Sequence, residues 1–297
     1  MIEMVIEQRR RSLGGGLEVG RVLPFAKRRM VGPFVFFDHM GPLDMAPGVP
    51  ASVDVRPHPH IGLSTVTYLF SGEVMHRDSV GSQTPIRPHE VNWMTAGSGI
   101  THSERFEKAR AQGDRLHGIQ AWVALPQAEE ETNPSFSHHE GADLPQWSDA
   151  GVHGTLIAGT AYGLSAGART LSPLFYAHLD LEPGAVAEIP TGHTERAVYI
   201  AAGAVELDGA RYEAGKMLVL SGDASSLRAA EASKVMVLGG EPLGERYLYW
   251  NFVSSSKERL AQAAADWRAG RMKLPDLDHD EFIPLPDEPA PPAPSFS

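Results

Sequence analysis

The sequence predicts an all-β protein made of two antiparallel β-barrels followed by a C-terminal helix. Short apolar runs with a two-residue period recur in both halves of the chain, as expected for strands. The 30 glycines and 23 prolines fall largely between these runs, where turns are expected. A weakly patterned middle segment separates the two sets of runs. Many short strands at this spacing are typical of sandwiches and barrels.

The clearest strand of the first half is predicted at residues 63–70. It is rich in β-branched and aromatic residues, and Ser71 and Gly72 form a turn signal directly after it. Glycine or proline separates the further strands that we predict at residues 74–77, 91–94, 100–104 and 118–125. We therefore expect residues 1–130 to form the first barrel.

The second half repeats this pattern after a connecting region that we place at residues 131–170. There, polar residues and glycine replace the alternation. We then expect a second barrel at residues 171–250, with strands at 174–181, 197–201, 205–207, 217–220 and 235–238.

Residues 251–297 are predicted to form a helix and a proline-rich tail. Ser255 and Glu258 have the spacing of a capping box at the start of the helix. Leu260, Ala264 and Trp267 then share one helical face before a glycine ends the helix. The tail is rich in proline and acidic residues, which predicts an extended surface segment or disorder.

Composition narrows the functions that this chain can have. The formal net charge of −11 argues against direct nucleic-acid binding, which needs a basic surface. No apolar stretch approaches the roughly 20 residues of a membrane-spanning helix. The chain has no cysteine, which excludes disulfides, thiolate zinc sites and iron–sulfur clusters. Because the N-terminus also lacks the apolar segment of a signal peptide, we expect a cytoplasmic protein.

Two pairs of potential metal ligands stand out in the first half. His58 and His60 are two residues apart just before the strand predicted at 63–70, and His102 and Glu104 repeat this spacing at 100–104. Residues two apart on a strand point to the same face, so each pair can converge on one point. Pro59 places the first pair at a strand start or on an edge strand.

Three neutral imidazoles and a carboxylate form a donor set that suits iron(II), manganese, nickel, copper or zinc. Four protein ligands around an octahedral ion leave two positions open for water, oxygen or a chelating substrate, as a catalytic site requires. The second half contains no His-x-His pair, and residues 217–223, which correspond there to the segment with His102 and Glu104, contain no His-x-Glu pair. We therefore expect one mononuclear metal per chain, in the first barrel.

For four other histidines the sequence gives weaker indications of a role. His76, His117 and His178 could line a pocket, or they could be satisfied polar residues inside a barrel, and the sequence leaves both interpretations open. His39 follows Asp38 between aromatic and glycine residues. We expect it to hold a turn by hydrogen bonding.

At these motifs the chain resembles the pirin family. The resemblance extends over about residues 31–243 and rests on FFDHMGP at 36–42, HPH at 58–60, TVTYL at 65–69, WMTAGSGI at 93–100, HSE at 102–104 and GGEPL at 239–243. It implies a bicupin fold, in which two cupin-type, jelly-roll barrels pack together and the N-terminal barrel holds a metal, usually iron. The family's ligands fall on His58, His60, His102 and Glu104.

The resemblance also implies a function. Several relatives are associated with quercetin 2,3-dioxygenase activity, so we expect a metal-dependent cupin dioxygenase that opens a flavonol or similar enol with O2. Glu104 is our candidate catalytic residue, since it can accept the proton of the substrate hydroxyl. Other relatives are described as coregulators of transcription factors, so the alternative is a metal- and redox-dependent regulator that binds a protein partner.

Overall fold

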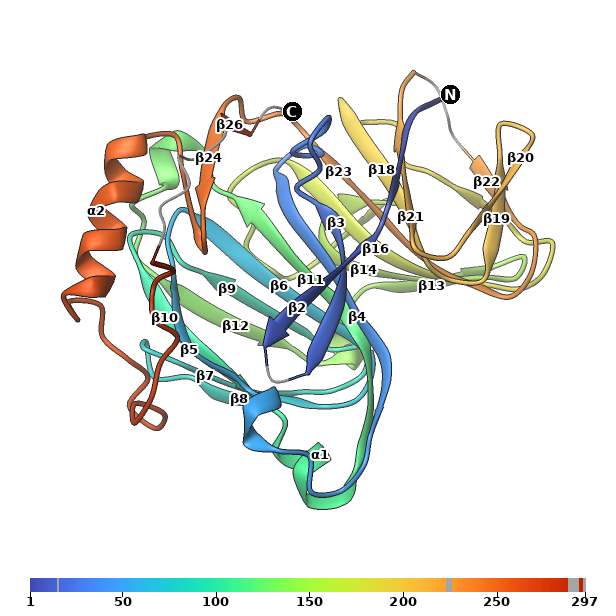
Figure 1. Ribbon diagram of the computed structural model, residues 1–297. Coiled ribbons are helices and arrows are strands. Elements are labelled where there is room, and N and C mark those ends of the chain that lie inside the picture. Colours follow the sequence, from blue (N-terminus) through green and yellow to red (C-terminus); the bar gives the residue numbers. More distant parts are fainter. Residues whose placement is uncertain (15, 223–225, 288–293, 296–297) are drawn as a thin grey trace.

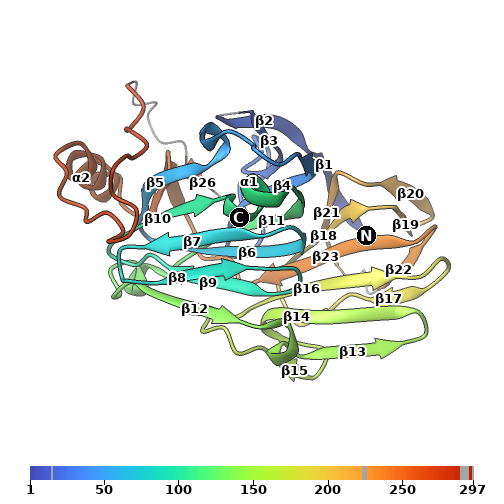
Figure 2. The ribbon, with the colours of Figure 1, turned by 90° about the horizontal axis from the view of Figure 1, so that it is seen from below.

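Two β-barrels lie side by side in the structure, which confirms the predicted fold class (Figures 1 and 2). The computed structural model describes residues 1–14, 16–222, 226–287 and 294–295. In each barrel a large antiparallel sheet faces a sheet of four strands. In this described part of the chain, no helix is both long and apolar enough to cross a membrane.

The first barrel contains all five strands predicted in the first half, now seen as β6, β7, β9, β10 and β11. Its large sheet has the spatial order β12 (Ser135–His139), β9 (Val91–Thr95), β6 (Leu63–Ser71), β11 (Asp114–Ala124), β4 (Phe34–Met45), β3 (Leu17–Leu23) and β2 (Arg9–Gly14). Its small sheet has the order β5 (Val55–His60), β10 (Ile100–Arg105), β7 (Val74–Asp78) and β8 (Gln83–Ile86).

The second barrel likewise contains the five strands predicted in the second half, seen as β16, β18, β19, β21 and β23. Its large sheet has the order β1 (Ile2–Glu7), β21 (Lys216–Leu220), β18 (Glu195–Ala202), β23 (Ser233–Gly240), β16 (Leu174–Leu181), β14 (Val152–Ala161) and β13 (Gln146–Asp149), with β15 (Leu164–Ser165) paired to β14. Its small sheet has the order β17 (Val186–Glu188), β22 (Ser226–Ala229), β19 (Ala204–Leu207) and β20 (Ala210–Glu213).

The remaining elements lie outside the two barrels or in their connections. A third sheet has the order β25 (Phe252–Ser254), β24 (Arg246–Tyr249) and β26 (Pro294–Ser295). The α-helices are α1 (Glu107–Gln112) and α2 (Lys257–Arg268), and short 3₁₀ turns occur at η1 (Ala51–Val53), η2 (Gln127–Glu129) and η3 (Gly141–Asp143).

Strand alternation explains why both faces of the large sheets are buried. On β6, Val66 and Tyr68 point toward the second barrel and belong to the core shared by the two barrels, whereas Leu69 packs inside the first barrel. Tyr176 and Tyr199 reach the same shared core from the second barrel. The two large sheets thus pack face to face, and residues of opposite parity fill each barrel interior.

The interiors of the two barrels differ in chemistry. The second is filled by a cluster rich in aliphatic side chains, including Leu156, Leu179, Val198, Val237 and Leu218. The first has buried histidines together with threonine and serine among its apolar residues. A metal centre therefore has polar side chains available in the first barrel, while close packing fills the second.

The predicted connecting region contains strands at the edges of both large sheets. Within residues 131–170, β12 pairs with β9 of the first barrel and β14 pairs with β16 of the second. The two-residue period is hard to see there because the register of β14 shifts between Leu156 and Ala158. In addition, β12 is only partly buried along its length.

The first strand was also not anticipated. β1 pairs with β21 in the second barrel before the chain enters the first barrel at β2. The N-terminal residues therefore belong structurally to the second large sheet and tie the two barrels together.

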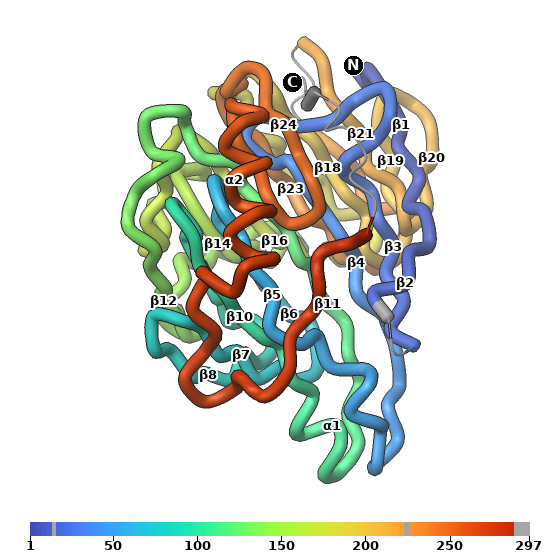
Figure 3. The backbone as a smooth tube through the Cα atoms, turned by 60° about the vertical axis from the view of Figure 1, so that its left-hand side comes forward, coloured from blue at the N-terminus to red at the C-terminus, as the bar shows by residue number. Residues whose placement is uncertain are grey.

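The segment after the second barrel returns to the first barrel. Figure 3 shows α2 and the chain that follows it running across β5 and β10. Gly62, with φ +67°, lies so close to the carbonyl oxygen of Val253 that a Cβ would collide with it. Only glycine fits this close approach between the first barrel and β25.

The predicted helix is confirmed, with a different cap. Ser256 is the N-cap, and its hydroxyl oxygen accepts the backbone N–H of Arg259 at 3.2 Å. Ser255 instead donates its hydroxyl to Glu130 at 3.1 Å, which removes it from the capping position. Of the predicted tail, residues 288–293 and 296–297 lie outside the described residues.

Candidate metal centre

The small sheet of the first barrel brings the predicted histidines together. His58 and His60 lie on β5, which is an edge strand as Pro59 suggests, and His102 lies on the neighbouring strand β10. The strands are antiparallel, and His102 pairs directly with His58. Because side chains two apart share a face, all three imidazoles point to the same side of the sheet.

The three imidazoles form a compact cluster. Their ring centroids are 4.4 Å apart for His58 and His102, 5.0 Å for His58 and His60, and 5.1 Å for His60 and His102. One ring nitrogen from each lies within 4.8 Å of the others. Among the described residues, this is the one group of three or more histidine or carboxylate side chains with that spacing.

Hydrogen bonding orients each ring. The Nδ1 of His58 donates to the carbonyl oxygen of Arg56 at 2.9 Å, and that of His60 donates to the carbonyl oxygen of Asn251 at 3.0 Å. The Nδ1 of His102 lies 3.3 Å from His76. Because a carbonyl oxygen can only accept, Nδ1 of His58 and of His60 carries the hydrogen, and their Nε2 atoms have a free lone pair, as a metal-ligating histidine requires.

Two unpartnered nitrogens test whether a metal fits. The Nε2 atoms of His60 and His102 are buried and have no hydrogen-bond partner. A buried acceptor without a partner costs roughly 1–3 kcal/mol, so such atoms are rare unless something binds them. A divalent ion held by three imidazole nitrogens satisfies them, so the residues present fit a metal.

Burial also sets the charge of this cluster. It lowers the pKa of His58 to about 4 and holds the pKa of His60 and His102 well below the ordinary value. All three rings are therefore neutral near neutral pH, which is the form that binds metal.

Glu104, the fourth predicted ligand, lines the same cavity as His58 and His60. Its carboxylate is not part of the group of atoms within 4.8 Å of one another. Glu104 lies opposite Val55, and the pairing of β10 with β5 is irregular between His102 and Glu104. Such an irregularity changes the direction of a side chain, here that of Glu104 relative to His102. Its role as a ligand remains a prediction.

Gln120 is the partner of Glu104. Burial raises the pKa of Glu104 to about 7, and a hydrogen bond with Gln120 opposes this shift. Thr67 donates to the amide oxygen of Gln120 at 2.7 Å. That bond leaves the Gln120 amide nitrogen, a donor, for Glu104.

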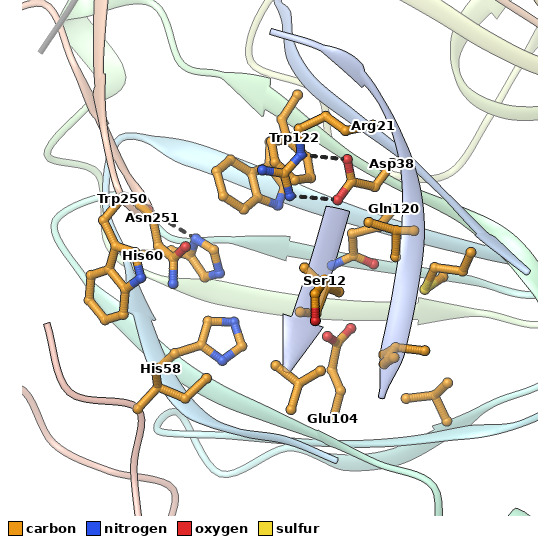
Figure 4. Close-up of a pocket in the computed structure, with 18 of the residues that line it drawn as sticks. Ser12, Arg21, Asp38, His58, His60, Glu104, Gln120, Trp122, Trp250 and Asn251 are labelled. Atoms are coloured by element: carbon orange, nitrogen blue, oxygen red, sulfur yellow. Dashed lines mark hydrogen bonds and ion pairs between the residues drawn. The ribbon is translucent and has the colours of Figure 1, made fainter. Parts of the chain in front are cut away.

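A cavity of about 490 Å³ adjoins the histidines. Figure 4 shows His58 and His60 beside Trp250 and Asn251, with Glu104 and Ser12 across from them. Most of the other side chains that line the cavity are apolar or aromatic: Leu13, Leu17, Val19, Phe36, Met40, Val55, Val74, Phe106, Trp122, Leu248 and Ile283. The volume is in the range of small-molecule sites.

Stacked rings form one wall of this cavity. Trp122 meets His60 edge-on at 5.0 Å and stacks on Phe36 at 3.9 Å. The guanidinium of Arg21 covers the other end of the column, 4.4 Å from the centre of the Phe36 ring, and forms two 2.8 Å hydrogen bonds to Asp38. This part of the wall is therefore a stacked aromatic column with a charged pair at its end.

Sequence reasoning missed several of these lining residues. Gln120 and Trp122 had a signal, since they alternate on a predicted strand whose register could have placed them on one face. Asn251 and Ile283 had none, because they reach the cavity only through the return of the C-terminal segment.

The structure also shows where four other histidines of the sequence analysis lie. His76 contacts His102, whereas His117 and His178 lie between the barrels beside Phe70. His39 lies inside β4, where its Nδ1 is 2.7 Å from the hydroxyl of Tyr199 and its Nε2 is 2.8 Å from His117. The prediction that His39 holds a turn is wrong, because β4 continues through His39. Its side chain contacts Tyr199 of the second barrel and His117 of the first.

Family comparisons agree with this geometry. The family model described as Pirin matches residues 16–123, and the one described as Pirin C-terminal cupin domain matches residues 176–273. The chain belongs to the pirin family. The cluster of His58, His60 and His102 lies within the first matched segment, and the strands of the aliphatic second barrel lie largely within the second.

Individual relatives support the same assignment. A pirin-like protein of Caulobacter vibrioides is 61% identical to this pirin-family chain, covering 97% of it and 100% of the relative. The structure of a quercetin 2,3-dioxygenase from Acinetobacter baumannii is 31% identical, covers 96% of each chain and has a TM-score of 0.86. A bacterial pirin from Escherichia coli, solved with nickel(II), is 19% identical, covers 82% of this chain and 100% of its own, and shares the fold with a TM-score of 0.62.

Proposed function

We propose that this protein is a metal-dependent dioxygenase of the quercetin 2,3-dioxygenase type, which opens a flavonol or a similar enol with O2. The observation that carries the proposal is the cavity of about 490 Å³ that adjoins His58, His60 and Glu104. A named quercetin 2,3-dioxygenase with a TM-score of 0.86 supports it.

The proposed metal ligands are His58, His60, His102 and Glu104, and the proposed metal is iron(II). The mixed nitrogen and oxygen set also suits manganese, nickel, copper and zinc. When bound, the metal would act as a Lewis acid that favours the ionised hydroxyl of the substrate.

The side chains of the cavity would perform the remaining tasks. The aromatic side chains of Trp122 and Phe36, which line the cavity, would pack against an aromatic substrate. Glu104, whose pKa burial raises to about 7, would accept the hydroxyl proton, with Gln120 keeping the carboxylate in place. The apolar lining would exclude bulk water from the reacting atoms.

Oxygen uptake by metal-loaded protein in the presence of quercetin tests this function. We expect stoichiometric consumption of O2 and quercetin, and loss of both in His102→Ala. As a matched control, His153→Ala changes a histidine whose side chain is 54% exposed and should leave turnover unchanged. Metal-loaded protein that neither binds nor consumes any flavonol would contradict the proposal and favour a regulator that binds a protein partner.

A further inference from the structure

His76 and Asp78 lie on the strand next to His102 and do not belong to the cavity lining described above. On β7 they face β10 so that Asp78 pairs with His102 and His76 pairs with Glu104. His76 is 5% exposed, Asp78 1% and His102 1%. Three polar side chains thus form a buried row that ends at a proposed metal ligand.

The contacts along this row are continuous. The Nδ1 of His102 is 3.3 Å from the Nδ1 of His76, and the Nε2 of His76 is 2.9 Å from Oδ2 of Asp78. The other carboxylate oxygen, Oδ1, accepts the backbone N–H groups of Val80 at 3.0 Å and Ser82 at 2.9 Å.

The carboxylate of Asp78 sets the direction of the first hydrogen bond in this row. A carboxylate can only accept, and the two backbone donors hold Asp78 with Oδ2 toward His76, so the Nε2 of His76 must donate. A His76 ring with one hydrogen then presents Nδ1 as an acceptor, to which the Nδ1 of His102 donates. The Nε2 of His102 then carries a free lone pair, and it is one of the buried nitrogens that have no hydrogen-bond partner.

The His76 ring is also held in place by packing. Phe136 on β12 stacks against it, with ring centroids 4.4 Å apart and an interplanar angle of 14°. His76 lies on the small sheet of the first barrel and packs against Phe136 of the large sheet, and this contact limits rotation of its ring.

We propose that His76 and Asp78 are positioning residues that lock His102 in the tautomer whose Nε2 binds the metal. The inference rests on the metal centre proposed above. Partners that orient a ligating histidine typically contribute about 10–100-fold to metal affinity.

Asp78→Asn is the sharpest variant because it changes little but hydrogen-bond direction. The amide oxygen can still accept from Val80 and Ser82, which places the amide nitrogen against His76. Two donors then face each other unless His76 moves its hydrogen to Nδ1. That shift forces the hydrogen of His102 onto Nε2, where it blocks the metal.

Zinc affinity, measured by competition with a chromophoric chelator, reports the effect. We expect about 10–100-fold weaker binding in Asp78→Asn and in His76→Phe, which keeps the stacking but removes the acceptor. His76→Gln should lie nearer to the wild type, because its amide oxygen can accept from His102. Asp180→Asn is the matched control, since Asp180 lies 3.7 Å from buried His178 in the second barrel, and it should bind zinc like the wild type.

Nitrogen NMR of histidine-labelled, metal-free wild-type protein supplies a second readout that needs no variant. We expect His102 to be protonated on Nδ1, and protonation on Nε2 would overturn the proposal. Unchanged zinc affinity in both Asp78→Asn and His76→Phe, with wild-type melting profiles, would also overturn it. Wild-type protein that fails to bind zinc would instead refute the metal centre itself.

Discussion

The Nδ1 of His60 donates its hydrogen to the backbone carbonyl of Asn251 at 3.0 Å, across 191 positions of sequence. The segment that carries Asn251 is held by a buried ion pair between Arg246 and Glu130, with 3.1 Å between Nε and Oε1. Glu130 also accepts from the hydroxyl of Ser254 at 2.9 Å. The C-terminal segment thus orients a proposed ligand in the first barrel.

Glu130→Ala should destabilise the fold strongly. It leaves Arg246, which is 3% exposed, as an uncompensated buried charge, and breaking such a pair costs about 3–5 kcal/mol of unfolding free energy. Denaturant unfolding of the metal-free protein measures this. The neighbouring Glu131→Ala breaks the exposed pair with Arg259 and should cost about 0–1 kcal/mol. Equal losses in the two variants would mean that the buried pair does not hold this segment.

Metal content should be about one ion per chain. Elemental analysis of protein purified without added metal should show this stoichiometry, because the described residues contain one cluster of suitable spacing. His58→Ala and His102→Ala should each empty most of the site, since each removes one of three buried nitrogens. Two tightly bound ions per chain, or full occupancy in either variant, would contradict the ligand assignment.

Glu104→Gln should separate metal binding from catalysis. The amide oxygen can still coordinate weakly, so part of the metal should remain. Turnover per bound metal should fall about 10²–10⁴-fold, because the amide cannot accept the hydroxyl proton. Quercetin consumption divided by measured metal content gives this quantity. Normal turnover per metal would limit Glu104 to a ligand or structural role.

Acid should weaken the junction between the barrels. Burial lowers the pKa of His39 to about 3, of His117 to about 4 and of His178 to about 3, from 6.5. The folded state therefore binds fewer protons than the unfolded chain, and the stabilisation present above about pH 6.5 is lost as pH falls toward 3 to 4. Lys234 and Asp180, which flank this junction, act in opposite directions on His178.

Unfolding free energies of metal-free protein between pH 8 and pH 4 test this prediction, since removing the metal excludes effects of metal release. His178→Asn should be less stable at pH 8 but lose less stability on acidification, by on the order of a few kcal/mol. The exposed-site control His153→Asn should keep the wild-type dependence. An unchanged pH dependence in His178→Asn would show that this histidine does not contribute to acid sensitivity.

Local pattern in the sequence was enough to predict the strands and the three clustered histidines. The two-residue period of segments such as 63–70 survives because each strand has two faces with distinct surroundings. The spacing of His58 and His60 survives for the same reason, since one strand fixes which side chains share a face, whereas the pairing irregularity between His102 and Glu104 was not visible in the sequence. These features depend on residues close together in the chain.

Features that depend on distant packing could not be read in this way. β1 joins the second barrel, the carbonyl of Asn251 binds His60, and His39 contacts Tyr199 across the interface. A backbone carbonyl carries no sequence signature, and the partner of a buried histidine is set by which sheets meet. The sequence by itself determined two barrels and a candidate ligand set, whereas only the tertiary structure decided the orientation of each imidazole, because that orientation depends on hydrogen-bond partners supplied by other strands.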